Sequence, residues 1–435
     1  MRTNLYRLPS EETLTDAKLN EFIMRHSGEC AFRYSMLQEA YETDYPLLHE
    51  PLKPKWKPDN RIMVNFAKYI VDTMNGFFIG HPIKLQVDDG NEAVEKYVDF
   101  LDQYNDQDDN NAELSKICSI FGKGYEMYYV DENGNIGITY LSPLDAFMIY
   151  DDSVLERERY FVRLYYDSNQ ILHGSVSDET KVRWFTIKGK LLWDADEKIH
   201  GFDGVPASEY VEPVLTMINA YNKAISEKAN DVDYFADAYL KVLGSKLEED
   251  DVAHIRDDRI INFDGDTERL IVEFLQKPDG DTTQEHLIDR LEKLIFHISM
   301  VANISDENFG TSSGIAMKYK LQAMSNLEKT KERKFTSGMN RRYRLIFSNP
   351  VSGMKKDDWV KIHPHFTPNF PANLQEEAEI AKNLEGVVSQ ETQLGVLSIV
   401  DNVQDEIKKI DTDQNKVRAD PVMKQMFGGG GQDDE

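Results

Sequence analysis

Two histidines separated by a single residue are the first candidates for metal chemistry in this chain. His363 and His365 flank Pro364, and side chains two positions apart on a strand share one face. A metal site needs three or four ligands, and this pair supplies only two. We therefore expect no bound metal.

Three further motifs that could indicate catalysis or cofactor binding are each incomplete. Gly122 and Gly124 form half of a dinucleotide-binding fingerprint, but Met127 occupies the third glycine position. Ser352 and Lys355 match S-x-x-K, without the S-D-N and K-T-G motifs that accompany it in known enzymes. The pattern G-x-x-x-x-G-K-[ST] does not occur, so the sequence predicts no phosphate-binding loop of an NTP-driven motor. We expect no catalytic residue and no cofactor.

Asp131, Asn133 and Asn135 resemble the first ligands of a calcium-binding loop. The twelfth position of such a loop is a bidentate Glu, and Ser142 stands there. Asn133-Gly134 is instead a strong signal for a tight β-hairpin. The sequence therefore predicts a plain hairpin at this place.

The elements that would position these residues follow from the apolar pattern. Helical spacing predicts helices at 11–45, 61–80, 91–104 and 112–122, with a proline-rich connector at 46–60 and a strand at 83–87. Alternation from residue 124 to 200 predicts an antiparallel meander with strands at 125–130, 136–140, 161–166, 171–176, 181–187 and 190–193. A strand at 358–367 and helices at 373–384, 390–397 and 403–410 are expected near the C-terminus.

Two long amphipathic helices enclose an acidic segment. The first, about 213–240, would be about 40 Å long at 1.5 Å per residue. The second, about 283–303, repeats apolar residues in steps of four and three, which is the spacing of a helix-packing seam; they are Leu287, Leu291, Leu294, Ile298 and Val301. Residues 241–281 between them contain twelve Asp or Glu and six Lys or Arg. This segment is either an independent acidic subdomain or an extension, at the tip of a helical stalk, that is offered to partners.

A glycine- and serine-rich segment, 306–314, separates the second helix from a third one at about 315–348. Glycine permits backbone conformations that other residues avoid, which suits a mobile hinge. The third helix contains nine cations and two Glu; the cations are Lys318, Lys320, Lys329, Lys331, Arg333, Lys334, Arg341, Arg342 and Arg344. Two interpretations stay open: a solvated face that balances acidic neighbours, or a helix near phosphate or acidic subunit surfaces.

The overall charge limits the class of protein. The chain has 77 acidic and 50 basic residues, for a formal net charge of −27. Proteins that hold DNA tightly neutralise its phosphates with a basic face, so this charge argues against stable nucleic-acid binding. It is compatible with a channel wall that repels a duplex and lets it slide, and also with acidity that only keeps the chain soluble.

Compartment and membrane signals are sparse. Cys30 and Cys118 are the two cysteines, and such sparse use fits a reducing cytoplasm, with both thiols in the core. The apolar runs are shorter than the roughly 18–20 residues that span a bilayer. The N-terminal residues include no apolar h-region, so we expect no secretory signal.

Several segments carry a family resemblance when they are taken in order along the chain. They are Asp59–Thr73 with Gly76, Gly80 and Pro82; Asn219-Ala-Tyr-Asn222 with Phe235–Ala238; Ser312–Leu321; and Phe366–Pro371 with Asn373–Glu379 and Val388–Thr392. Together they resemble the portal family of tailed double-stranded DNA phages, in particular long-tailed phages and prophages of Gram-positive bacteria. The likeness covers about residues 40–410.

This resemblance implies an α+β protein with the phage portal fold: a mixed wing domain, two long stem helices, a small α/β clip and a helical C-terminal crown. The implied boundaries are wing 1–212, stem helix one 213–240, clip 241–281, stem helix two 282–305, tunnel loop 306–314, the rest of the wing 315–371 and crown 372–427. Residues 428–435, which are rich in Gly and acidic side chains, are expected to form a disordered tail.

The resemblance also implies a non-enzymatic role. About twelve copies would form a closed ring at one capsid vertex, as the channel for packaging and ejection of double-stranded DNA. The implied partners are the terminase large subunit, a head–tail adaptor protein, and the major capsid and scaffold proteins, with no membrane. The protein would lie in the virion, and in the host cytoplasm during assembly.

The implied sites fall into three groups. The tunnel loop that approaches DNA would be Asn308, Phe309, Gly310, Thr311, Ser312, Ser313 and Gly314. Two cations beyond it, Lys318 and Lys320, would lie near DNA. The partner-binding clip would present Glu248, Glu249, Asp250, Asp251, Asp257 and Asp258.

Two other classes of protein remain as alternatives. One is a phage head-completion or scaffold-like structural protein, which would not need two long helices around a clip. The other is a cytoplasmic metal-dependent hydrolase that uses His363 and His365.

Overall fold

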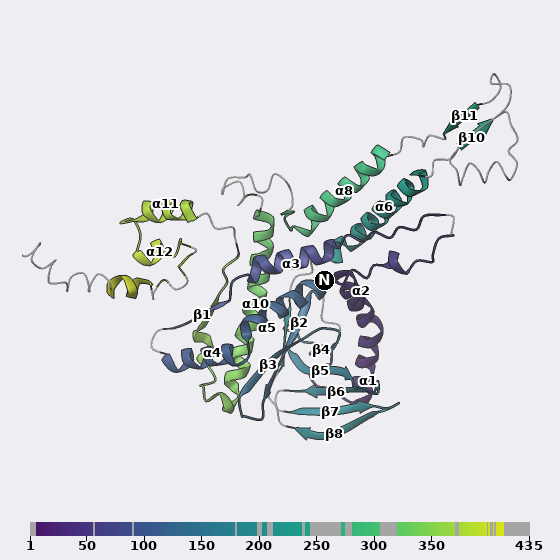
Figure 1. Cartoon of the computed structure of the whole chain (residues 1–435). Helices are drawn as coiled ribbons and strands as arrows, with labels where there is room; N and C mark the ends of the chain where they lie inside the picture. The colour runs from purple at the N-terminus through teal and green to yellow at the C-terminus, as the bar shows by residue number, and fades with distance from the viewer. Residues whose placement is uncertain are drawn as a thin grey trace, which may run out of the picture. The chain divides into compact units, whose positions relative to one another are not determined.

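The computed structural model describes residues 6–54, 57–88, 91–178, 181–197, 202–206, 212–236, 240–243, 271–274, 281–304, 319, 321–369, 374–397, 399–400, 403 and 406–412. The chain divides into two compact units. The first contains residues 1–311 and 317–369, and the second contains residues 312–316 and 370–435. The first unit contains all the described strands and the long helices (Figure 1).

The N-terminal helix is continuous but contains one wide turn. Helices α1 (Asp16–Arg25) and α2 (Ala31–Tyr41) are joined by a π-helical turn at His26–Cys30. That turn brings the His26 ring within 3.0 Å of the Tyr6 hydroxyl. A single helix over 11–45 was predicted from the spacing of the apolar residues; the observed helix is shorter at both ends, running from residue 16 to 41, and contains the π turn.

The next helices begin at places that the apolar pattern does not mark. Helix α3 (Phe66–Ile79) starts five residues after its predicted start at residue 61. Helix α5 (Gln107–Phe121) starts five residues before its own predicted start at residue 112. Between α5 and α4 (Glu92–Tyr104), Asp106 takes a left-handed conformation with φ of 48°. The polar residues after it belong to the helix, and two of them, Gln107 and Asn111, are buried.

The alternating segment forms two sheets instead of one meander. Five strands make an antiparallel sheet in chain order: β4 (Ala146–Tyr150), β5 (Glu158–Tyr166), β6 (Leu172–Ser177), β7 (Val182–Ile187) and β8 (Leu191–Glu197). The predicted Asn133-Gly134 hairpin is present, with Gly134 at φ +81°, but its strands β2 (Lys123–Val130) and β3 (Ile136–Leu141) join β9 (Phe202–Pro206) in a separate sheet. The prediction missed β4 and β9.

The two long amphipathic helices form an antiparallel hairpin, drawn in teal and green in Figure 1. They are α6 (Glu212–Ala236) and α8 (Asp281–Ser299). Short strands β10 (Leu240–Leu243) and β11 (Ile271–Phe274) follow α6 and precede α8, and they pair antiparallel. The helix predicted to reach residue 240 therefore ends earlier, where the backbone enters a strand.

A third long helix runs through the body of the first unit. Helix α10 (Gln322–Ser348) packs against α3 and β9, and Phe335 meets the ring of Phe78 on α3 in an edge contact. After α10, strand β12 (Ile362–His365) pairs antiparallel with β1 (Lys84–Val87). Buried apolar residues from these helices and from the two larger sheets form the main core. A second, smaller cluster contains Tyr125, Ala146, Met148, Phe161 and Val182.

The second unit is helical in its described part. It contains α11 (Leu374–Leu384) and α12 (Gln390–Leu394), and residues 406–412 are also helical. Ser389 caps α12 by accepting a hydrogen bond from the Thr392 amide, and Gln393 donates to the Ala381 carbonyl at 2.9 Å. Among all the described helices of the chain, none combines the length and the apolar character that a bilayer crossing requires.

Candidate functional site

The predicted tunnel loop, the two predicted DNA-proximal cations and the predicted clip side chains all lie outside the described residues. Their placement therefore stays a prediction; they are residues 308–314, Lys318 and Lys320, and the six acidic residues between 248 and 258. What the structure describes is the α6–α8 hairpin that brackets the acidic segment, and the surface on which that hairpin stands.

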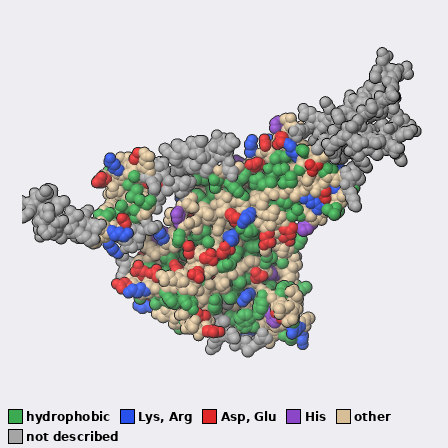
Figure 2. Space-filling view, viewed as in Figure 1, with side chains coloured by type: hydrophobic (Ala, Val, Ile, Leu, Met, Phe, Trp, Pro, Cys, Tyr) green, Lys and Arg blue, Asp and Glu red, His purple; other side chains and the backbone are tan. Residues whose placement is uncertain are grey.

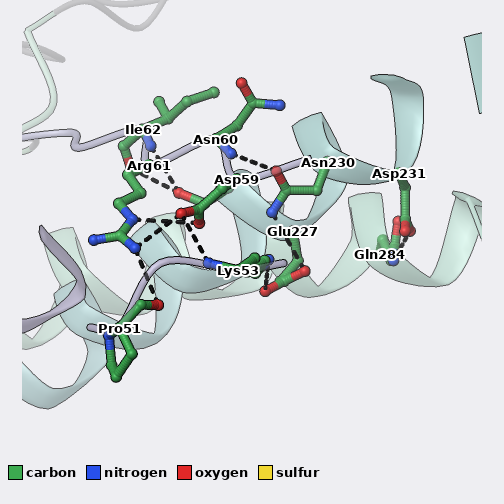
Figure 3. Close-up of polar contacts among 11 residues, drawn as sticks. Pro51, Lys53, Asp59, Asn60, Arg61, Ile62, Glu227, Asn230, Asp231 and Gln284 are labelled. Atoms are coloured by element: carbon green, nitrogen blue, oxygen red, sulfur yellow. Dashed lines mark hydrogen bonds and ion pairs between the residues drawn. The ribbon is translucent and has the colours of Figure 1, made fainter. Parts of the chain in front are cut away.

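A ladder of polar side chains on α6 holds the proline-rich connector. Asn222 accepts a hydrogen bond from the Val64 amide at 2.9 Å, and Asn230 accepts one from the Asn60 amide at 2.5 Å. Between them, the Ser226 hydroxyl accepts from the Ile62 amide at 2.8 Å and donates to the Ile62 carbonyl at 3.1 Å. The rung between Asn60 and Asn230 is drawn in Figure 3. All three α6 side chains are at most 6% exposed.

This ladder explains why α3 starts late. The amides of residues 60, 62 and 64 are committed to side chains of α6, so the segment before Asn65 stays extended. Asn65 then caps α3, with its side-chain oxygen accepting from the Lys68 amide at 2.8 Å. The apolar pattern of residues 62–64 fits a helix equally well, and the tertiary contact decides between the two.

Arg61 fixes the rest of the connector. Its guanidinium donates to the carbonyls of Leu48 at 2.7 Å and Pro51 at 3.2 Å, and it pairs with the Asp59 carboxylate at 2.9 Å. The hydrogen bond from Arg61 lowers the pKa of Asp59. Arg61 thereby ties Pro51 and Asp59 to each other next to Asn60, which belongs to the ladder (Figure 3).

A second set of charges ties the connector and α8 to opposite sides of α6. Lys53 pairs with Glu227 at 2.9 Å, which lowers the pKa of that carboxyl. On α8, Glu285 pairs with Lys228, and Gln284 donates to Asp231 at 3.1 Å. At 100° per residue, positions 228 and 231 of α6 face almost directly away from the ladder at 222, 226 and 230. Helix α6 thus lies between α8 and the connector.

Helix α8 packs part of its apolar surface inside the chain and leaves part of it exposed. Ile288 and Ile295 are buried at 7% and 0% exposure, whereas Leu287 is 51% exposed and Ile298 is 45% exposed. Of the predicted seam 287–291–294–298–301, only Leu287 and Ile298 are exposed; Leu291 and Leu294 are partly buried, and Val301 is buried. On the face drawn in Figure 2, hydrophobic side chains lie exposed along this hairpin among charged ones.

The basic helix is partly structural, a role that neither interpretation of its sequence included. Lys331 is fully buried and donates to the Ser115 carbonyl at 3.0 Å and to the Ser119 hydroxyl at 2.6 Å. Arg342 is 1% exposed and forms a two-point ion pair with Glu126, itself 2% exposed. These two cations reach neither solvent nor phosphate. The neighbouring Lys329, Arg333, Lys334 and Arg344 are exposed.

The two candidate metal ligands face the neighbouring strand. His363 lies 3.1 Å from a carboxylate oxygen of Asp88, and His365 lies 3.0 Å from the side-chain oxygen of Gln86. Among the residues that the structure describes, no three His, Cys, Asp or Glu side chains form a group that could hold a metal ion. The hydrolase alternative has no metal site in this part of the chain.

Sequence reasoning missed the ladder. Its only signal is the polar spacing 222, 226, 230 on one face of an otherwise amphipathic helix, and that spacing is also common on solvent-exposed faces. Burial of all three side chains distinguishes the two cases, and burial is a property of the folded chain.

A long helical hairpin that stands on an α/β body and brackets an acidic segment is the arrangement that the family resemblance implied. A family model described as "Phage portal protein, SPP1 Gp6-like" matches residues 20–419. The chain belongs to this phage portal protein family, whose members are structural proteins.

The chain is also similar to two individual proteins. The portal protein of Clostridium phage phiCD119 is 22% identical over 409 residues, which cover 85% of this chain and 88% of that protein. A chain from a solved structure described as the neck of an empty GTA particle is 9% identical, with a TM-score of 0.46, and the match covers 76% of this chain and 89% of the other. A structural likeness at that level adds nothing to the family assignment.

Proposed function

We propose that this chain is the subunit of a phage portal ring, which forms the channel for double-stranded DNA at one capsid vertex. The observation that carries the proposal is the family match across residues 20–419. The subunit itself would be non-enzymatic, with the packaging ATPase on another polypeptide. About twelve copies would close the ring through one heterologous contact repeated around it.

The exposed row of α8 is the contact that we assign to ring formation. Leu287 and Ile298 lie half exposed beside the partly buried Leu294, at a spacing that suits packing against another helix. Within the described residues no other helix covers this row. A neighbouring subunit would bury it.

The acidic segment 241–281, at the far end of the hairpin, would be the clip. Its Glu248–Asp251 run and the pair Asp257-Asp258 would bind the terminase large subunit and, later, a head–tail adaptor. Strands β10 and β11 pair at its two ends, which supports a small folded unit there. Major capsid and scaffold proteins would contact the outside of the ring.

The tunnel loop at 306–314 would approach DNA, with Lys318 and Lys320 behind it. Contact with the duplex would be weak and independent of base sequence, made through the phosphate backbone. A net charge of −27 per subunit, repeated around a ring, gives an acidic tube that disfavours tight binding and suits sliding. By the same assignment, residues 1–212 and 315–371 are the wing and residues 372–427 the crown.

Negative-stain imaging of the purified full-length chain tests this proposal. Rings with a central hole are the expected result, and a protein that stays monomeric at every concentration would overturn it. Particles that assemble without a hole would favour a head-completion protein instead. As a portal subunit, the protein would belong to the virion, and to the host cytoplasm during assembly.

A further inference from the structure

The ladder between α6 and the connector has a geometry that fixes one axial position of the helix. Four residues of an α-helix rise by about 6.0 Å, and two residues of an extended strand rise by about 6.7 Å. Side chains at 222, 226 and 230 can therefore each meet an alternate amide, at 64, 62 and 60. The match extends over only three rungs, because each step of four residues also turns the side chain by about 40° around the helix axis.

The residue four positions before the ladder disfavours a slip by one turn in one direction. Ile218 stands there, and its side chain has no hydrogen-bond acceptor. A shift that brings Ile218 opposite Val64 would leave the Val64 amide without its side-chain partner. The ladder contacts are part-buried, and a hydrogen bond lost in such a place costs free energy, so the shifted position is disfavoured.

Apolar packing alone would not impose this restriction. Val214 and Ile218 of α6 are fully buried against the body, but the hydrophobic effect has no direction, so part of such a contact can form again after a shift. Hydrogen bonds require a donor and an acceptor at a defined distance and angle. The polar rungs therefore carry the axial specificity.

The ladder also leads directly into α3. Asn65 follows the last rung, caps α3 through the Lys68 amide, and donates to the Tyr41 carbonyl at 2.8 Å. The Tyr69 amide bonds to the Asn65 carbonyl at 3.2 Å. An axial displacement of α6 would pull residues 60–64 and, through them, the first turn of α3.

We propose that Asn222, Ser226 and Asn230 act as a register lock: they hold α6 at a single axial position and pass its displacement to α3 through residues 60–65. They are positioning residues of the stem. The functional consequence rests on the proposed portal role, in which a load on the stem hairpin would reach the wing at this point.

Amide hydrogen exchange on the full-length protein, read at single residues by fragmentation mass spectrometry, tests the lock. Ser226→Ala removes both bonds to Ile62, so the Ile62 amide should exchange about tenfold faster. If the lock transmits, the Lys68 and Tyr69 amides at the start of α3 should also exchange faster. Ser226→Thr keeps the hydroxyl and should stay close to the wild-type rates.

Two further variants separate the lock from general destabilisation. Asn219→Ala is the matched control, since Asn219 lies on the same helix and its side-chain oxygen has no hydrogen-bond partner among the described residues; exchange at 60–64 should not change. Asn230→Ala affects the outermost rung and is the variant to use if Ser226→Ala does not fold. Unchanged exchange at 60–64 in both ladder variants would refute the lock. Faster exchange there without any effect at Lys68 and Tyr69 would refute the transmission to α3.

Imaging the same samples keeps the two proposals distinguishable. Wild-type protein that forms no rings but shows the expected exchange pattern would contradict the portal role and leave the lock in place. Wild-type rings combined with unchanged exchange in Ser226→Ala would contradict the lock alone.

Discussion

Arg342 on α10 and Glu126 on β2 form an ion pair inside the core, with Nε 3.1 Å from Oε2 and Nη2 2.5 Å from Oε1. Tyr128 donates a further hydrogen bond to Glu126 at 2.7 Å, and Arg342 also donates to the Asn111 side chain at 2.6 Å. Partners on α5 and β2 therefore meet the Nε and Nη2 groups of Arg342, whereas its buried Nη1 has no hydrogen-bond partner among the described residues. This contact joins the long helix to the small sheet.

Removing one member of this pair should destabilise the fold much more than removing both. Arg342→Ala leaves a buried carboxylate without its cation, which typically costs about 3–5 kcal/mol of unfolding free energy. The double variant Arg342→Met with Glu126→Leu should recover most of that loss, because no buried charge remains. Urea denaturation of the three proteins measures it. A double variant as unstable as the single one would contradict this account.

Lys331 should give the protein a stability that rises with pH. Burial lowers the pKa of Lys331 from 10.5 to about 7, so between those values the unfolded chain holds a proton that the folded one has released. The free energy of unfolding then increases from about pH 7 upward, by at most about 1.4 kcal/mol per pH unit for this group. Denaturation at pH 7 and pH 9 should show a larger gain for wild type than for Lys331→Met.

The Lys331→Met comparison also isolates the group, since all other titrating residues stay in both proteins. Glu328, one turn away, acts in a different range: burial raises its pKa from 4.5 to about 7. As the pH rises from 4.5 to about 7, the contribution of Glu328 to the free energy of unfolding decreases, and at higher pH it is constant. An equal pH dependence in wild type and Lys331→Met would show that Lys331 stays charged in the folded protein.

The outward row of α8 should matter for assembly and not for folding. Leu287 is 51% exposed, so Leu287→Glu should change the unfolding free energy by less than about 0.5 kcal/mol while it abolishes or strongly reduces rings. Val154 is fully exposed in the loop between β4 and β5, and Val154→Glu serves as the matched control that keeps its rings. Mass photometry and thermal unfolding provide the two readouts. Normal rings in Leu287→Glu would exclude this row as the contact.

Deleting Gly310–Gly314 should impair passage of DNA without affecting the ring. The five residues lie in the predicted tunnel loop, and their small side chains suit a movable segment. We expect rings of normal size and reduced DNA packaging or retention in assembled heads. If packaging and retention match wild type, the loop has no role in holding or passing the duplex.

Secondary structure was well predicted wherever a strong local period exists. The two hairpin helices and α10, the Asn133-Gly134 turn, and four of the five strands of the larger sheet follow from apolar spacing and turn chemistry alone. Element boundaries were missed where a distant contact competes with local preference. Residues 62–64 are extended because α6 binds their amides. Helix α5 begins at Gln107 although that side chain is polar and buried.

The candidate site was predictable only in outline. The family resemblance and the net charge of −27 came from the residues themselves, because family motifs and composition are written in the chain. The roles of individual side chains were not. Two of the nine cations of the basic helix are buried partners of the core, and one apolar row of α8 is turned outward. Those assignments depend on how each helix is rotated in the fold, and rotation is set by all the packed neighbours together, which no local pattern records.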